Sequence, residues 1–139
     1  MHRIELAVEP LEGLCPGYDG EWDHVSQQLI ALAEAIPADR YSWRPGPGVR
    51  STSEVFIHIA AGNFWLLSIT GPPMPAELKS VSMEKTVTFK PEFIDWLKRS
   101  LDAVKTAHAG IKPGDLQRKV RSAVLSRTVT DRNFLFTHA

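Results

Sequence analysis

The sequence predicts an all-α protein of four helices in a single domain. In three stretches of the chain, apolar residues recur at spacings of three and four positions, the pattern of a helix that buries one face. Prolines and glycines stand where these stretches should end. The 139 residues are enough to build one hydrophobic core without disulfide staples.

The composition excludes several classes of function. The 16 Lys and Arg residues balance the 16 Asp and Glu residues, so no net charge points to a nucleic acid or a membrane surface. The single cysteine, Cys15, excludes an internal disulfide framework and fits a reducing compartment. We expect no signal peptide, and no segment approaches the ~20 apolar residues of a membrane span. We therefore expect a soluble cytoplasmic protein with no nucleic-acid or membrane partner.

The first helix is expected after an N-terminal arm. Residues 1–20 contain two prolines and three glycines, which favour little regular structure. Over 21–36 the apolar residues follow the helical spacing, and Pro37 cannot continue the helix. These apolar residues are Trp22, Val25, Leu29, Leu32 and Ile36. Either Asp19 or Gly20 is a plausible cap.

A loop rich in proline and glycine, residues 37–50, precedes the second helix. Its aromatics, Tyr41 and Trp43, are expected to fold back over the end of the core with their polar tips outward. The helix should begin with a capping box. In this motif the Ser51 hydroxyl accepts a hydrogen bond from the backbone N–H of Glu54, and the Glu54 carboxylate reaches back.

The second helix carries a histidine among its apolar residues. The stripe expected to face inward consists of Val55, Ile59, Gly62, Leu66 and Ile69. His58 is expected to point along this stripe, where a buried imidazole needs partners for both ring nitrogens. From spacing alone, a core histidine with one hydrogen bond and a water is preferred over a metal ligand. The helix should end near Gly71, before a run of prolines.

A third helix follows a long connection, residues 71–89. Connections of this length are more often functional or mobile than simple links between helices. The helix should start near Pro91 and stop at Gly110. The residues at its helical spacing are Phe93, Leu97, Leu101, Val104 and His108. We expect His108, at the frayed end, to contact solvent or to complement the helix dipole rather than to bind a metal.

The end of the chain is predicted to hold a fourth, short helix. Residues 111–129 form a connection with room for a short extended piece. Thr130 is expected to cap the helix, with Asp131 in its first turn. Phe134, Leu135 and His138 follow at helical spacing. The helix has only about two turns before the sequence ends at Ala139, fewer than the usual ~11 residues.

Parts of the sequence resemble the DinB/YfiT-like superfamily, small bacterial proteins of which many are regarded as metal-dependent enzymes. The similarity is carried by Ile36-Pro37-Ala38-Asp39-Arg40-Tyr41-Ser42-Trp43-Arg44-Pro45, by Gly48-Val49-Arg50-Ser51, by Glu54-Val55 and by His58-Ile59-Ala60. The resemblance runs from about Glu21 to the end of the chain. It implies an antiparallel four-helix bundle over residues 21–139, with a long second connection, a last helix that is cut short, and pairing into a homodimer.

The resemblance also implies a metal site. Members commonly bind zinc or nickel through three histidines, one on the second helix and two spaced i, i+4 on the last helix, where one ion can reach both. Carried over, the first ligand is His58 and the next is His138, while the third falls at position 142, beyond the sequence. Two imidazoles bind a divalent ion weakly unless a carboxylate, water or a second chain adds donors, so the metal is absent if nothing completes the site.

Residues near the two histidines have alternative roles. Glu54 and Asp131 are each candidates to accept an imidazole N–H, although helix capping is the preferred role of both. Arg44 and Arg50 flank the loop and are candidates to clasp an anionic group, although solvated loop arginines are more common.

Two functions therefore remain open. The resemblance favours a thiol-dependent transferase or hydrolase in which a His-ligated divalent metal acidifies a bound thiol or water for attack on a small-molecule substrate. The alternative is a non-catalytic helical bundle that acts through homodimer or partner association. A short fourth helix would leave apolar surface uncovered, and such surface invites a partner.

Overall fold

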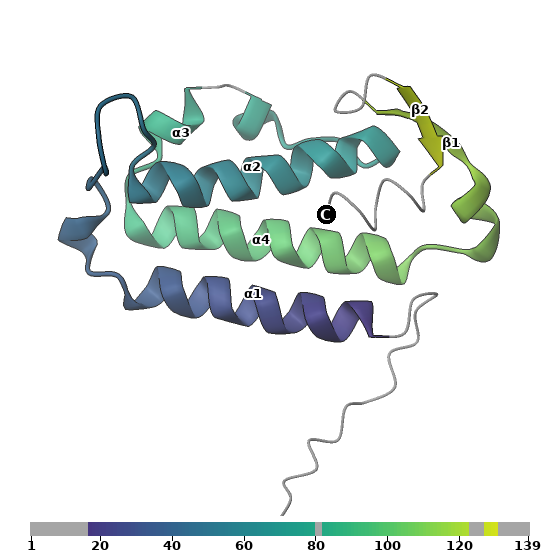
Figure 1. Ribbon diagram of the computed structural model, residues 1–139, viewed down its shortest axis with the longest axis horizontal. Helices are drawn as coiled ribbons and strands as arrows, with labels where there is room; N and C mark the ends of the chain where they lie inside the picture. The colour runs from purple at the N-terminus through teal and green to yellow at the C-terminus, as the bar shows by residue number, and fades with distance from the viewer. Residues whose placement is uncertain (1–16, 80–81, 123–126, 131–139) are drawn as a thin grey trace, which may run out of the picture.

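The fold is all-α, as the sequence predicts. A computed structural model describes residues 17–79, 82–122 and 127–130 of the chain. Its long helices are α1 (Tyr18–Ala35), α2 (Thr52–Thr70) and α4 (Lys90–Ala109). The shorter elements are the 3-10 helices Ala38–Arg40, Ala76–Lys79 and Pro113–Gln117, the single-turn helix α3 (Met83–Thr86), and the strands β1 (Lys119–Ser122) and β2 (Arg127–Thr130). Figure 1 shows the long helices side by side, with α4 between α1 and α2.

Helices α2 and α4 run parallel. Near the start of both helices the Phe56 ring stacks on the Phe93 ring, with centroids 6.0 Å apart. Further along, the Asn63 amide donates a hydrogen bond to the Ser100 hydroxyl at 3.2 Å. In each pair the two residues are 37 positions apart in the sequence. Because this offset is the same at both places, the two helices point the same way. The connection 71–89 is long because the chain must return along α2 before α4 begins (Figure 1).

Helix α1 runs antiparallel to α4. Near the start of α1 the Trp22 indole N–H donates to the Leu101 carbonyl, in the second half of α4, at 3.1 Å. At the other end of α1 the Lys90 ammonium, at the start of α4, donates to the Glu34 carbonyl at 2.7 Å. Helices α1 and α4 are therefore antiparallel, and the antiparallel arrangement of the complete bundle stays a prediction. The fourth helix predicted after Thr130 lies outside the described residues.

The helix ends follow local signals closely. The capping box of α2 is formed as predicted: the Ser51 hydroxyl accepts the Glu54 N–H at 3.3 Å, and the Glu54 carboxylate accepts the Ser51 N–H at 2.8 Å. Gly71 ends this helix. Helix α1 begins earlier than expected, so residues 18–20 of the predicted arm are helical. Its N-terminal cap is Gly17, whose φ of 93° favours glycine, and not Asp19 or Gly20.

The core is built around α4 and one loop aromatic. All residues of the predicted α4 stripe are buried: Phe93, Leu97, Leu101, Val104 and His108. Tyr41 folds back over the core as expected, with its ring 4.4 Å from that of Phe93. Its hydroxyl points inward, however, because it donates a hydrogen bond to the Ala33 carbonyl. The same expectation is wrong for Trp43, which is exposed.

Solvent contact, one of the two alternatives expected for His108, is wrong, whereas the other, complementing the helix dipole from the last turn of α4, stays a prediction. The side chain is buried at the end of α4, where its ring lies 4.4 Å from the Tyr18 ring and 6.3 Å from the Trp22 ring. The early start of α1 explains the difference, because it adds Tyr18 to the helix that covers this end of α4.

The segment after α4 contains the short extended piece that the sequence allowed. Strands β1 and β2 pair antiparallel, with Val120 opposite Val129. The Arg118 guanidinium donates to the Thr70 carbonyl at 2.7 Å, which ties the start of this hairpin to the end of α2. In the part of the chain that the structure describes, no helix combines the length and apolar character needed to span a bilayer.

Candidate functional site

The buried face of α2 is not the stripe that the spacing predicted. The buried residues of the helix are Ser53, Glu54, Phe56, Ile57, Ala60, Leu67 and Thr70. Val55 is exposed, and the side chain of His58 is 53% exposed. Apolar residues occupy nearly all sides of α2, so their spacing alone cannot identify the side that meets α4. The prediction of an inward-pointing His58 is therefore wrong.

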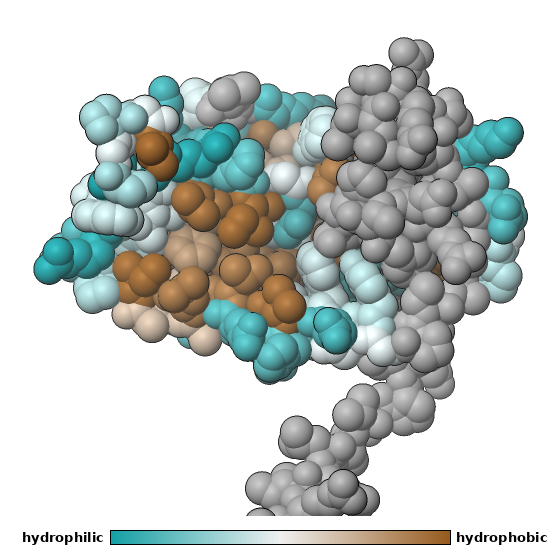
Figure 2. All heavy atoms as spheres, in the orientation of Figure 1, coloured by the Kyte–Doolittle hydropathy of each residue, from teal (hydrophilic) through white to brown (hydrophobic). Residues whose placement is uncertain are grey.

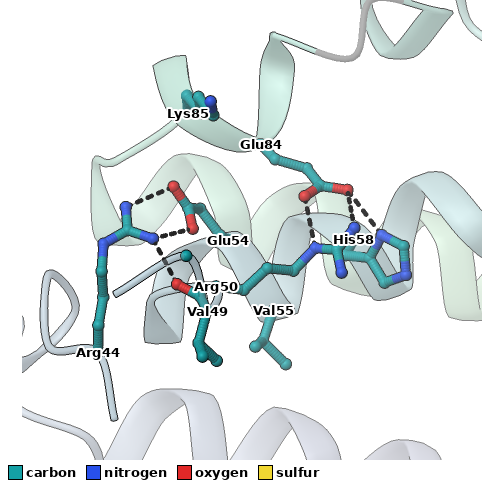
Figure 3. Close-up of a pocket in the computed structure, with 9 residues that line it drawn as sticks. Arg44, Val49, Arg50, Glu54, Val55, His58, Glu84 and Lys85 are labelled. Atoms are coloured by element: carbon teal, nitrogen blue, oxygen red, sulfur yellow. Dashed lines mark hydrogen bonds and ion pairs between the residues drawn. The ribbon is translucent and has the colours of Figure 1, made fainter. Parts of the chain in front are cut away.

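Instead, His58 lines an open pocket of about 1010 Å³ (Figure 3). Three segments supply its walls: the loop before α2, the first two turns of α2, and α3. The lining residues are Arg44, Gly48, Val49, Arg50, Glu54, Val55, His58, Glu84 and Lys85. The pocket therefore gathers the candidate ligand and both loop arginines that the sequence singled out.

Glu84 of α3 joins His58 to Arg50. One carboxylate oxygen, Oε1, lies 2.6 Å from His58 Nδ1, and the other, Oε2, accepts from Arg50 Nε at 2.6 Å (Figure 3). Burial alone would raise the pKa of the Glu84 carboxyl, but the hydrogen bonds from Arg50 and His58 outweigh it and lower this pKa below its ordinary value. Since an ionised carboxylate only accepts, the proton of the Glu84–His58 bond belongs to Nδ1.

Glu54 is occupied by a different arginine. Arg44 donates to both oxygens of its carboxylate at 2.6 Å, and also to the Val49 carbonyl at 2.8 Å. The hydrogen bonds from Arg44, and then that from the Ser51 backbone, lower the pKa of Glu54 to about 2. Glu54 therefore caps α2 and pairs with Arg44, in keeping with its preferred role. It is not the acceptor for His58.

Only one of the two predicted metal ligands lies in the described part of the chain. His138, like Asp131, falls outside it, so the distance from His58 to His138 is not tested. Within residues 17–79, 82–122 and 127–130, no three His, Cys, Asp or Glu residues form a group that could hold a metal ion. His58 alone nevertheless has the setting of a ligand: Nδ1 faces a carboxylate, and Nε2 has no hydrogen-bond partner among the described residues.

Glu84 was not among the site residues predicted from the sequence. It lies 26 positions after His58, in a connection without helical periodicity. No pattern in this connection indicates which of its residues contacts α2. Two buried residues, Leu78 and Val87, hold this connection against the core. Such apolar anchors are visible in the sequence, but they do not determine which polar residue between them meets the pocket.

The fold and the site define an all-α protein with a histidine-bearing pocket beside its long second connection. The family model of the DinB superfamily matches residues 21–138, which is most of the chain. The chain belongs to the DinB superfamily, and the resemblance read from the sequence is confirmed. A search of curated proteins finds no match.

Proposed function

We propose that this protein is a metal-dependent enzyme in which His58 and His138 hold a divalent ion, zinc or nickel. The observation that supports the proposal is the setting of His58. Its Nδ1 is engaged by Glu84 at 2.6 Å, while its Nε2 remains available beside an open pocket. Metal-ligating histidines are typically held in this way, with the second ring nitrogen bonded to a carboxylate.

The chain's own residues would hold the ion and leave room for the reactants. Two imidazoles leave positions for water, for a carboxylate or for a donor from a second chain. When bound, the ion would lower the pKa of a coordinated water or thiol. The pocket volume of about 1010 Å³ is at the upper end of the ~300–1,000 Å³ typical of small-molecule sites. A thiol-dependent transferase or a hydrolase fits these properties.

Metal analysis of the purified full chain tests this proposal. After incubation with zinc or nickel above about pH 7, where imidazoles are neutral, we expect a stoichiometric ion by elemental analysis. His58→Ala and His138→Ala should each remove it. His24→Ala is the matched control, because His24 is exposed on α1 and bonds only to Gln28 among the described residues. A wild type without metal, or a His58→Ala variant that retains it, would contradict the proposal.

A second candidate function is association of two copies through an apolar surface. On α1, Val25 and Leu32 are 45% and 54% exposed, and Val55 on α2 is 42% exposed. Figure 2 shows apolar side chains gathered over the face formed by α1 and α2. Clustered apolar surface of this kind commonly marks an interaction site, and a homodimer would cover it on both copies.

Light scattering during gel filtration tests the homodimer. We expect the wild type to have the mass of two chains and Leu32→Glu to have the mass of one, because a buried unpaired carboxylate opposes association. Gln27→Glu introduces the same charge at another exposed position of α1 and should leave the dimer intact. A monomeric wild type at all concentrations, or a dimeric Leu32→Glu, would exclude this mode of association.

A further inference from the structure

Glu84 connects three separate segments of the pocket. From α3 it contacts Arg50, in the loop before α2, and His58, on α2 itself. Its side chain is 20% exposed, whereas those of Arg50 and His58 are 47% and 53% exposed. The least exposed member of the trio is therefore the one that both others contact.

We propose that Glu84 is the positioning residue that presents Nε2 of His58 to the metal ion. The inference rests on the proposed function, and it assigns a task to a residue of the long connection. Because a carboxylate oxygen of Glu84 lies 2.6 Å from Nδ1 and carboxylate oxygens accept hydrogen bonds, Glu84 keeps the imidazole proton on Nδ1. The lone pair of the neutral ring is then on Nε2, the nitrogen on the far side of the ring from Glu84 (Figure 3).

The surroundings of Glu84 make it suitable for this task. Arg50 holds the carboxylate through two nitrogens of its guanidinium, with Nε at 2.6 Å from Oε2 and Nη2 at 3.3 Å from Oε1. Helix α3 is anchored in turn by Val87, which follows it and is buried in the core. A ligand is held most reliably when its partner belongs to a fixed element and has its own supporting bonds. Arg50 and α3 provide that support.

The first test measures the tautomer of His58 without any metal. Long-range ¹H–¹⁵N spectra of the full chain at about pH 8, where imidazoles are neutral, should show the Nδ1–H form in the wild type. Glu84→Ala should convert His58 to the Nε2–H form, whereas Glu84→Gln, whose amide oxygen still accepts, should retain Nδ1–H. Glu77→Ala is the control, because Glu77 is an exposed acidic residue of the same connection. A wild type with Nε2–H, or a Glu84→Ala spectrum like that of the wild type, would overturn the inference.

The second test measures zinc affinity by competition with a chelator. Loss of an outer partner typically weakens binding by ~10–100-fold, so we expect this effect for Glu84→Ala, a smaller effect for Glu84→Gln and none for Glu77→Ala. Circular dichroism checks that each variant is folded. If Glu84→Ala does not fold, the zinc affinity of Glu84→Gln relative to the wild type decides the question.

The two tests separate the possible failures. Wild-type zinc affinity in Glu84→Ala, or in Glu84→Gln where that variant decides, would overturn the role of Glu84 and leave the proposed function standing. A wild type that binds no metal would overturn both. Even then, the tautomer spectra would show whether Glu84 directs the proton of His58.

Discussion

Glu54 combines two stabilising contacts in one side chain. It accepts the Ser51 N–H at the start of α2 and pairs with both terminal nitrogens of Arg44. These contacts lower its pKa from an ordinary value of 4.5 to about 2 in the folded protein. A carboxyl whose pKa is lower in the folded state stabilises the fold above its unfolded pKa. That contribution is lost as the pH falls from about 4.5 towards 2.

Glu54→Gln should therefore lower stability in a pH-dependent way. The glutamine oxygen can still accept the Ser51 N–H, but it cannot form the charged pair with Arg44. Urea unfolding at pH 7 should give a lower midpoint for the variant than for the wild type, and the difference should shrink steadily between about pH 4.5 and pH 2. Glu77→Gln, at an exposed position, should show no such trend. A difference of constant size down to the acid limit would contradict the contacts described for Glu54.

What the sequence predicts about the site depends on the distance between partners. The two hydrogen bonds between Ser51 and Glu54 could be predicted, with both residues named, because they lie within one helical turn. His58 was identified as a candidate, but its exposure was not, because burial depends on where α4 packs. Glu84 could not be identified, since nothing in the local pattern of the connection relates it to His58.

At the scale of the helix, a single substitution in α2 should stabilise the fold. Gly62 lies in its middle, and an added Cβ would meet no atom of the described residues within 4 Å. Glycine in a helix interior costs about 0.5–1 kcal/mol relative to alanine because more backbone entropy is lost on folding.

We therefore expect Gly62→Ala to raise the free energy of unfolding by about 0.5–1 kcal/mol. Urea unfolding measures it. Gly48→Ala is the opposing control: Gly48 has a φ of 76°, which side-chain-bearing residues adopt at a cost of about 1–2 kcal/mol, so this variant should be less stable than the wild type. If Gly62→Ala were destabilising, something must pack against that face of α2 that the described residues do not include.

Helix ends and helix faces differ in how well the sequence predicts them. The ends of α2 and α4 were predicted closely because a serine cap, a first-turn proline and a following glycine are local signals. The buried face of α4 was also predicted, since charged residues mark its other sides. The buried face of α2 was not, because the helix is apolar on nearly every side. The spacing of apolar residues does not specify the direction in which a helix runs. The parallel pairing of α2 and α4 is therefore visible only in their contacts.

For the whole molecule, α4 is the element on which the other helices depend. It lies between α1 and α2, with Phe93 and Leu97 fully buried against them. Ion pairs also join α1 to α4, from Lys98 to Glu34 at 2.8 Å and from Lys105 to Asp23 at 2.9 Å. Helix α3 and the loop before α2, which line the pocket, lie at one end of this arrangement, and the β1–β2 hairpin lies at the other (Figure 1).

Adjacent residues of α4 can separate the contributions of apolar packing and ion pairs. Leu97→Ala should lower the free energy of unfolding by about 2–5 kcal/mol, because it removes buried contacts and leaves a cavity. Lys98→Ala removes the partner of Glu34 from a largely exposed pair, and such pairs contribute little to stability because solvent screens them. Urea unfolding at low and high salt distinguishes the two, since only the small effect of Lys98→Ala should diminish as salt screens the charges. Comparable losses from both variants would mean that charge pairing, and not the apolar face of α4, holds α1 in place.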